Sequence, residues 1–192
     1  MEISCVKKEE NYLLKITVEE NAVGIVYKVA AVLYRYHWHI LEAVIETVPG
    51  SLIKDVFIIQ GREKQDMTEE ILENIQTDFA KLLYSDNSLA EYINEFNTQL
   101  WDKNNKQLNN SINLFNPPTI DTTVLDIQTN KSPEKLLLIT GLLYTASIDI
   151  ASLIVKTDVD FERYSFLLKK ENGEKLDPKD LNSLEGKLRA VV

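Results

Sequence analysis

The chain has 192 residues, 44% of them hydrophobic and 27% charged, and a formal net charge of −9. This acidic balance argues against nucleic acid or an anionic membrane as a partner, because both need clustered Lys and Arg side chains. The single cysteine, Cys5, excludes an internal disulfide, and no apolar run approaches the ~20 residues of a membrane span. We therefore expect a cytoplasmic globular protein.

Residue periodicity predicts six elements in the first part of the chain. Leu14, Ile16 and Val18 alternate with polar residues, which is the period-two pattern of a half-buried strand. Apolar residues in 24–36 instead recur at the helical period. The expected elements, in order, are strands at 2–6 and 12–18, a helix at 24–36, strands at 40–48 and 52–60 joined by a Pro49-Gly50 turn, and a helix that begins near Thr68.

The second part of the chain repeats this order. Leu33, Tyr34 and Ile40 recur 110 positions later as Leu143, Tyr144 and Ile150, which is the mark of a duplicated unit. The expected elements are strands at 111–115 and 122–129, a helix at 133–147, strands at 150–157 and 161–169, and a last helix that Asp177-Pro178 begins. We therefore predict one domain at 1–84 and another at 111–192.

The residues between the two copies, 85–110, have no counterpart. They predict an extra amphipathic helix followed by an asparagine-rich linker. Its apolar stripe packs inside the molecule or docks another protein, and consists of Leu89, Tyr92, Ile93, Phe96, Leu100 and Trp101.

Strands and one-sided helices in this order predict an α+β fold with two ferredoxin-like sandwiches. Three short motifs also match a known family. They are Lys54-Asp55-Val56-Phe57-Ile58, Thr123-Val124-Leu125-Asp126-Ile127 and Asn172-Gly173-Glu174-Lys175-Leu176. In order and spacing they resemble the ACT domain, a regulatory module, and are similar to the C-terminal ACT pair of bacterial PII uridylyltransferases. The catalytic domains of those enzymes are absent from this chain, so uridylyl transfer is not its expected activity.

The chain departs from the usual ACT order, which ends with a fourth strand. Only Val191 and Val192 follow the last expected helix, whereas each copy gains a strand before its first one. We predict a permuted order, strand-strand-helix-strand-strand-helix, in which the additional strand takes the place of the missing one. In the alternative, the strand at 111–115 completes the first copy.

The resemblance implies a ligand site at the turn before the first helix of each copy, where backbone amides bind an amino acid. In the first copy this turn contains one residue of the family type, Gly24, and consists of Asn21, Ala22, Val23, Gly24, Ile25 and Val26. In the second copy it reads Lys131, Ser132, Pro133 and Glu134. Glu134 stands where glycine is expected and would add bulk and negative charge, so we expect this second site to be degenerate.

Three other sets of residues could support chemistry. His37 and His39 would face one way in a strand, as in some zinc sites, although a helix end with partly exposed aromatic residues is the alternative. Cys5 lacks neighbours that would stabilise a thiolate. An acid–base or metal set could be built from Asp126, Asp149, Asp158 and Asp160, but aspartates are ordinary at an outward strand position or in a turn. We assign no catalytic residue, metal or cofactor.

The resemblance implies a non-enzymatic regulatory protein that senses an amino acid or a similar small metabolite. Its place in nitrogen metabolism is implied only by the resemblance. We expect the copies to associate side by side and the chain to form a homo-oligomer, because edge strands tend to pair. The alternative is a protein–protein interaction or scaffold module that has lost ligand binding.

Overall fold

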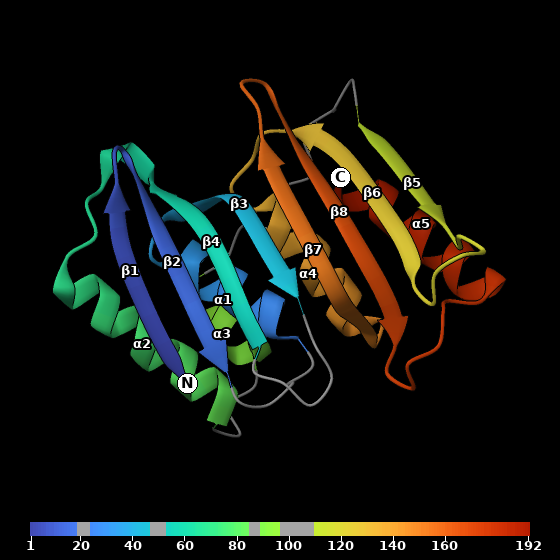
Figure 1. Ribbon diagram of the computed structural model, residues 1–192, viewed down its shortest axis with the longest axis horizontal. Coiled ribbons are helices and arrows are strands. Elements are labelled where there is room, and N and C mark those ends of the chain that lie inside the picture. Colours follow the sequence, from blue (N-terminus) through green and yellow to red (C-terminus); the bar gives the residue numbers. More distant parts are fainter. Residues whose placement is uncertain (19–23, 47–52, 85–88, 97–109) are drawn as a thin grey trace.

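The computed structural model describes residues 1–18, 24–46, 53–84, 89–96 and 110–192. These residues form eight strands, five α-helices and one short 3-10 helix (Figure 1). The strands are β1 (Glu2–Lys8), β2 (Asn11–Val18), β3 (Trp38–Glu46), β4 (Ile53–Gly61), β5 (Ser111–Phe115), β6 (Thr123–Asn130), β7 (Ile148–Thr157) and β8 (Phe161–Lys170). The helices are α1 (Ile25–Arg35), η1 (Arg62–Lys64), α2 (Glu69–Tyr84), α3 (Leu89–Phe96), α4 (Lys135–Thr145) and α5 (Pro178–Val191).

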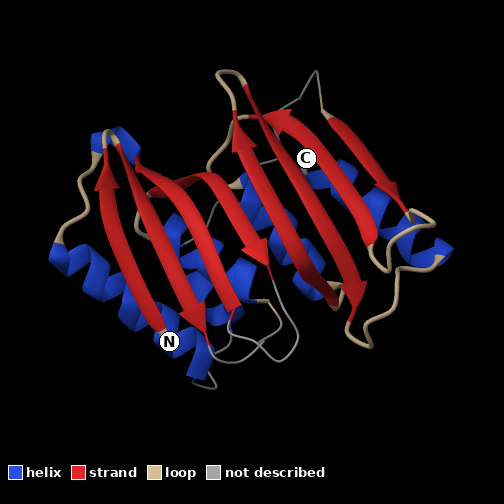
Figure 2. Cartoon of the chain, viewed as in Figure 1, coloured by secondary structure: helices blue, strands red, loops and turns tan. Residues whose placement is uncertain are grey.

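All eight strands belong to one antiparallel sheet, in the order β1-β2-β4-β3-β7-β8-β6-β5. The five α-helices lie on one face of this sheet, and no described element covers the other face (Figure 2). The fold is therefore α+β, as the sequence predicts. The two copies lie side by side through the pairing of β3 with β7, which joins them in a single continuous sheet. The division into domains at 84 and 111 stays a prediction.

The permuted order of elements is confirmed in both copies. β1 pairs with β2 at one edge of the sheet, and β5 pairs with β6 at the other edge. The alternative, in which β5 completes the first copy, is wrong. The connection after β5 is fixed within the second copy, because Asn116 donates a hydrogen bond to the Leu176 carbonyl (2.8 Å) and accepts one from the Thr123 hydroxyl (2.7 Å).

The two copies share the same register. Ile16 on β2 lies opposite Asp55 on β4, and in the second copy Ile127 on β6 lies opposite Tyr164 on β8. Strands β3 and β7 each have a register shift at corresponding places, between Ile40 and Glu42 and between Ile150 and Ser152. A position in one copy therefore has a defined counterpart in the other.

The helix starts and ends follow local capping chemistry. The Thr68 hydroxyl accepts a hydrogen bond from the Ile71 amide (3.2 Å), and Asp177 forms a capping box with Asp180, as expected for these residue types. One start differs from expectation: α4 begins at Lys135, and Pro133 precedes the N-cap residue Glu134. The Pro49-Gly50 turn, Leu100, Trp101 and the asparagine-rich linker up to residue 109 lie outside the described residues.

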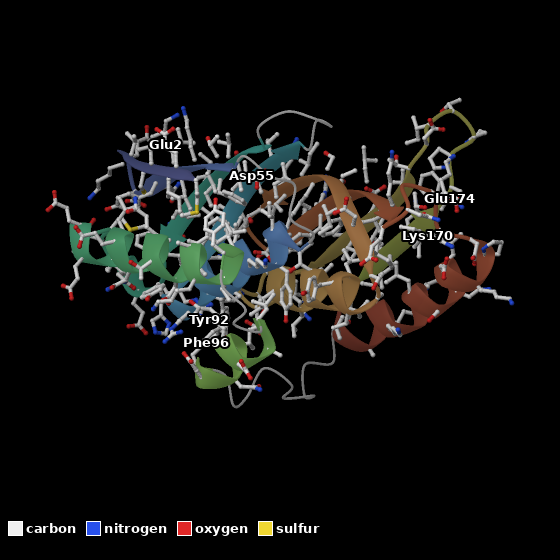
Figure 3. All side chains as sticks on the ribbon, turned by 90° about the horizontal axis from the view of Figure 1, so that it is seen from below. Glu2, Asp55, Tyr92, Phe96, Lys170 and Glu174 are labelled. Atoms are coloured by element: carbon white, nitrogen blue, oxygen red, sulfur yellow. The ribbon has the colours of Figure 1, made fainter. Side chains whose placement is uncertain are left out.

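The described part of the inserted helix α3 packs against the first copy. Leu89 and Tyr92 are buried, and Phe96 packs against the core. Figure 3 shows Tyr92 and Phe96 on the helix side of the sheet. The Tyr92 hydroxyl donates a hydrogen bond to Asp78 of α2 (2.9 Å), which also accepts one from Tyr36 (2.9 Å). The stripe thus packs inside the molecule over the residues that are described.

Candidate functional site

The first predicted turn ends at the start of α1. Gly24 is the N-cap residue of this helix, its φ of 82° lies in the left-handed region, and no side chain of the described residues caps this end. The helix also has no acidic residue in its first turn. Ile25 and Val26 are buried, so their side chains face the core rather than a ligand. Asn21, Ala22 and Val23 lie outside the described residues.

A residue of the second copy lies beside this helix start. The ring of Tyr144, near the end of α4, is so close to Gly24 that a Cβ atom on the glycine would be 2.5 Å from Tyr144 Cδ2. Tyr27 on α1 packs in the same way over Gly141 on α4, and the two tyrosine rings are 5.5 Å apart. The helices therefore run antiparallel, and the first predicted site lies at the contact between the copies.

Asp55 is the most deeply buried acidic group described in the first copy. It is 1% exposed and shares the inward face of β4 with Phe57 and Ile59, which are fully buried. Neither carboxylate oxygen has a hydrogen-bond partner among the residues that the structure describes. Burial raises the pKa of Asp55 from its ordinary 3.8 to about 7. Figure 3 shows Asp55 at the level of the sheet.

The counterpart of Asp55 in the second copy is Tyr164. The side chain of Tyr164 lies near the turn before α4. Its hydroxyl donates a hydrogen bond to Glu162, which is completely buried. The same carboxylate accepts a hydrogen bond from the backbone amide of Ser132 (3.4 Å) and lies 2.6 Å from His39 Nε2. Because the registers match, Asp55 occupies the position in the first copy that Tyr164 occupies in the second, beside Ile16 near the end of β2 that leads to α1.

The second predicted turn is therefore satisfied from within the chain. Glu162 provides a carboxylate to the Ser132 amide, the position that a bound carboxylate would need. Glu134 is the N-cap residue with a helical φ of −86° and no side-chain cap, and Lys135 donates to the Val191 carbonyl (2.8 Å). Lys131 is exposed and Pro133 partly buried. The two turns thus differ in that an internal carboxylate, Glu162, occupies the second one.

His39 does not share a strand face with His37. His37 has a φ of 62° and lies in the turn before β3, whereas His39 lies on β3 and contacts Glu162 of the other copy. The expectation that both rings face one way is wrong, because the strand begins only at Trp38. Among the described residues, no group of three His, Cys, Asp or Glu side chains is arranged to hold a metal ion.

His39 also borders an open pocket of about 530 Å³ near the β1–β2 turn. Lys7, Tyr12, Arg62 and Asp66 contribute to its walls. Asp66 accepts hydrogen bonds from Lys7 (2.7 Å) and Tyr12 (2.6 Å). Nε and Nη2 of Arg62 have no hydrogen-bond partner among the described residues, and its guanidinium lies over the ring of Tyr34. We assign no ligand to this pocket.

The other candidate residues show ordinary structural roles. Cys5 is half-buried on β1, and burial raises the pKa of its thiol, which disfavours the reactive thiolate. Asp126 points outward from β6 as expected, and Asp158 accepts a hydrogen bond from the Val159 amide in the β7–β8 turn (2.8 Å). Burial raises the pKa of Asp149 at the start of β7.

Comparison of the chain with protein-family models, with curated proteins and with solved structures gave no significant match. Within the described ranges, none of the helices has the length and apolar character needed to cross a membrane.

Sequence reasoning did not assign a role to three residues of this region: Asp55, Glu162 and Tyr144. Asp55 and Glu162 are acidic residues at inward positions of a strand that are otherwise apolar or aromatic. Asp55, for example, precedes Phe57 and Ile59 by two and four residues. An acidic residue at an inward position is a signal that could have been read, because burial of a carboxylate is costly without a partner. The contact of Tyr144 with Gly24 has no such local signal.

Proposed function

We propose that this chain is a non-enzymatic regulatory protein with two ACT-like halves, and that the start of α1 binds an amino acid or a similar small metabolite. The observation that supports this most is Asp55, a fully buried carboxylate without a described partner. Natural proteins seldom leave a buried carboxylate unpaired. Such a group therefore indicates a site where a cationic group of a ligand binds.

The two ends of an amino acid match the two features of this site. Its carboxylate would accept hydrogen bonds from the backbone amides at the start of α1, where no described side chain caps the helix and the helix dipole favours negative charge. Its ammonium group would pair with Asp55. Gly24 would allow the ligand to approach the backbone closely.

The second turn supports the proposal by contrast. There, the Glu162 carboxylate accepts the hydrogen bond from the turn, and the His39 ring lies against the same carboxylate. The chain itself therefore supplies the groups that a bound amino acid would supply at the first turn. We propose that this turn is the degenerate site and that it holds the two copies together. A ligand at the first turn would act by favouring one arrangement of α1 relative to Tyr144 of α4.

The alternative function, an interaction module without a small ligand, follows if the first turn is also satisfied internally. The described residues of α3 give this alternative little support, because their apolar side chains pack against the first copy. Ligand binding separates the two functions directly.

The test is thermal unfolding in the presence of each of the twenty amino acids. At a hundredfold excess over its dissociation constant, a ligand adds about 2.7 kcal/mol of stability, and for a chain of this size this raises Tm by roughly 5–10 °C. We expect Asp55→Asn and Gly24→Glu to abolish the shift. Asp121→Asn, at an exposed position in the β5–β6 connection, is the matched control and should keep it.

Failure of every amino acid to stabilise the wild-type protein would favour the interaction module. A shift that persists in folded Asp55→Asn, as judged by circular dichroism, would place the ligand elsewhere.

A further inference from the structure

The uncovered face of the sheet exposes apolar side chains at its centre. Val44 on β3 and Ile154 on β7 are 50% and 43% exposed and lie directly opposite each other on the two middle strands. Val56 continues this row on β4 beside Val44. All five α-helices lie on the opposite face, so no described element shields these side chains (Figure 2).

Charged residues flank this apolar centre in a pattern of opposite signs. The row of cross-strand partners that contains Val44 also contains Lys15 on β2 and Asp126 on β6. Each of these two residues lies on the third strand counted from the midline between β3 and β7. In the next row, Glu42 on β3 and Lys156 on β7 lie on either side of the midline. None of these four side chains forms an ion pair with another described residue.

We propose that this face is the interface between two copies of the chain, packed face to face about a two-fold axis parallel to the strands. Such an axis exchanges the two sides of the midline. Lys15 of one copy then faces Asp126 of the other, Glu42 faces Lys156, and Val44 faces Ile154. An axis perpendicular to the strands would instead place Lys15 over Lys15, which is unfavourable.

The dimensions of the sheet suit such an interface. Eight strands spaced ~4.8 Å apart and ~25 Å long present roughly 800 Å² per copy, which is the area of a stable protein–protein interface. Two sheets pack in this way at a separation of about 10 Å, with side chains interdigitated.

The edges of the sheet are less suitable for self-association. β1 has Lys7 and Lys8 at its end, and charged side chains on an edge strand oppose pairing with another sheet. β5 has only five residues, which limits the hydrogen bonds it could form with a partner strand. This inference concerns a surface remote from the start of α1 and stands whether or not that site binds a ligand.

The test is sedimentation equilibrium of the full chain over a range of concentrations. We expect a dimer whose dissociation constant rises at least a hundredfold in Ile154→Asp, because the new charge would be buried against an apolar surface. Val159→Asp, in the β7–β8 turn where the valine is 83% exposed, is the matched control and should leave the dimer unchanged.

A charge exchange tests the direction of the axis. Lys15→Asp and Asp126→Lys should each weaken the dimer severalfold, and the double variant should restore it because the pair is re-formed in the opposite sense. The proposal is overturned by a wild-type chain that remains monomeric, by a dimer that Ile154→Asp does not affect, or by a double variant no tighter than the single ones.

Discussion

Asp55 shows at the scale of a single residue how burial and charge conflict. Its pKa is raised by desolvation to about 7, so between its ordinary 3.8 and this value the folded chain holds a proton that the unfolded chain releases. Stability therefore falls as the pH rises through this window and is constant above it. The loss amounts to up to about 4 kcal/mol at pH 8, at ~1.36 kcal/mol for each pKa unit.

This cost predicts that Asp55→Asn stabilises the unliganded protein at high pH. The amide has nearly the same shape but cannot ionise, so the variant should exceed the wild type by a few kcal/mol at pH 8, and the gain should shrink as the pH falls toward 4. Urea unfolding at both pH values measures it, with Asp121→Asn as the control for loss of an exposed carboxylate. A variant that is less stable than the wild type at pH 8 would show that Asp55 has a stabilising partner.

At the scale of elements, the contact between the start of α4 and strands β3 and β8 joins the two copies. Glu162 accepts hydrogen bonds from Tyr164 and from the Ser132 amide, and His39 reaches it from the other copy. The low-dielectric surroundings make each of these bonds strong and an unpaired group costly.

Removal of this carboxylate is therefore expected to destabilise the fold. Glu162→Ala leaves the buried Tyr164 hydroxyl and the Ser132 amide without an acceptor, and we expect a loss of about 3 kcal/mol in the free energy of unfolding. Glu162→Gln keeps one oxygen and should lose less. The midpoint of urea unfolding reports both, and Glu2→Ala at an exposed position is the control. A loss below about 1 kcal/mol for Glu162→Ala would contradict a joining role.

Local patterns predicted the elements well, because each depends on neighbouring residues. Thr68 and Asp177 determine helix starts within one turn, and the alternation of Leu14, Ile16 and Val18 defines β2. The contact of His39 with Glu162 spans 123 positions, so no local pattern contains it. The alternation of Asp55 with Phe57 and Ile59 indicates its inward position, whereas its place beside the end of β2 that leads to α1 follows only from the pairing of β4 with β2.

At the scale of the whole molecule, the two copies form one sheet, and helices α1 and α4 run antiparallel beneath it. This arrangement brings Tyr144 of the second copy against Gly24 at the first predicted site. A ligand there would contact the region where the copies meet. The proposed regulation thus depends on a site that one copy alone does not complete.

The most direct test of this account is calorimetric titration of the wild-type chain with the amino acid that stabilises it best, at pH 6 and at pH 8. The proposed ammonium–Asp55 pair requires an ionised carboxylate, so a group with a pKa of about 7 predicts an affinity roughly tenfold higher at pH 8 than at pH 6. Asp55→Asn should show no measurable binding at either pH. Equal affinity at the two pH values, or tight binding to Asp55→Asn, would contradict the account.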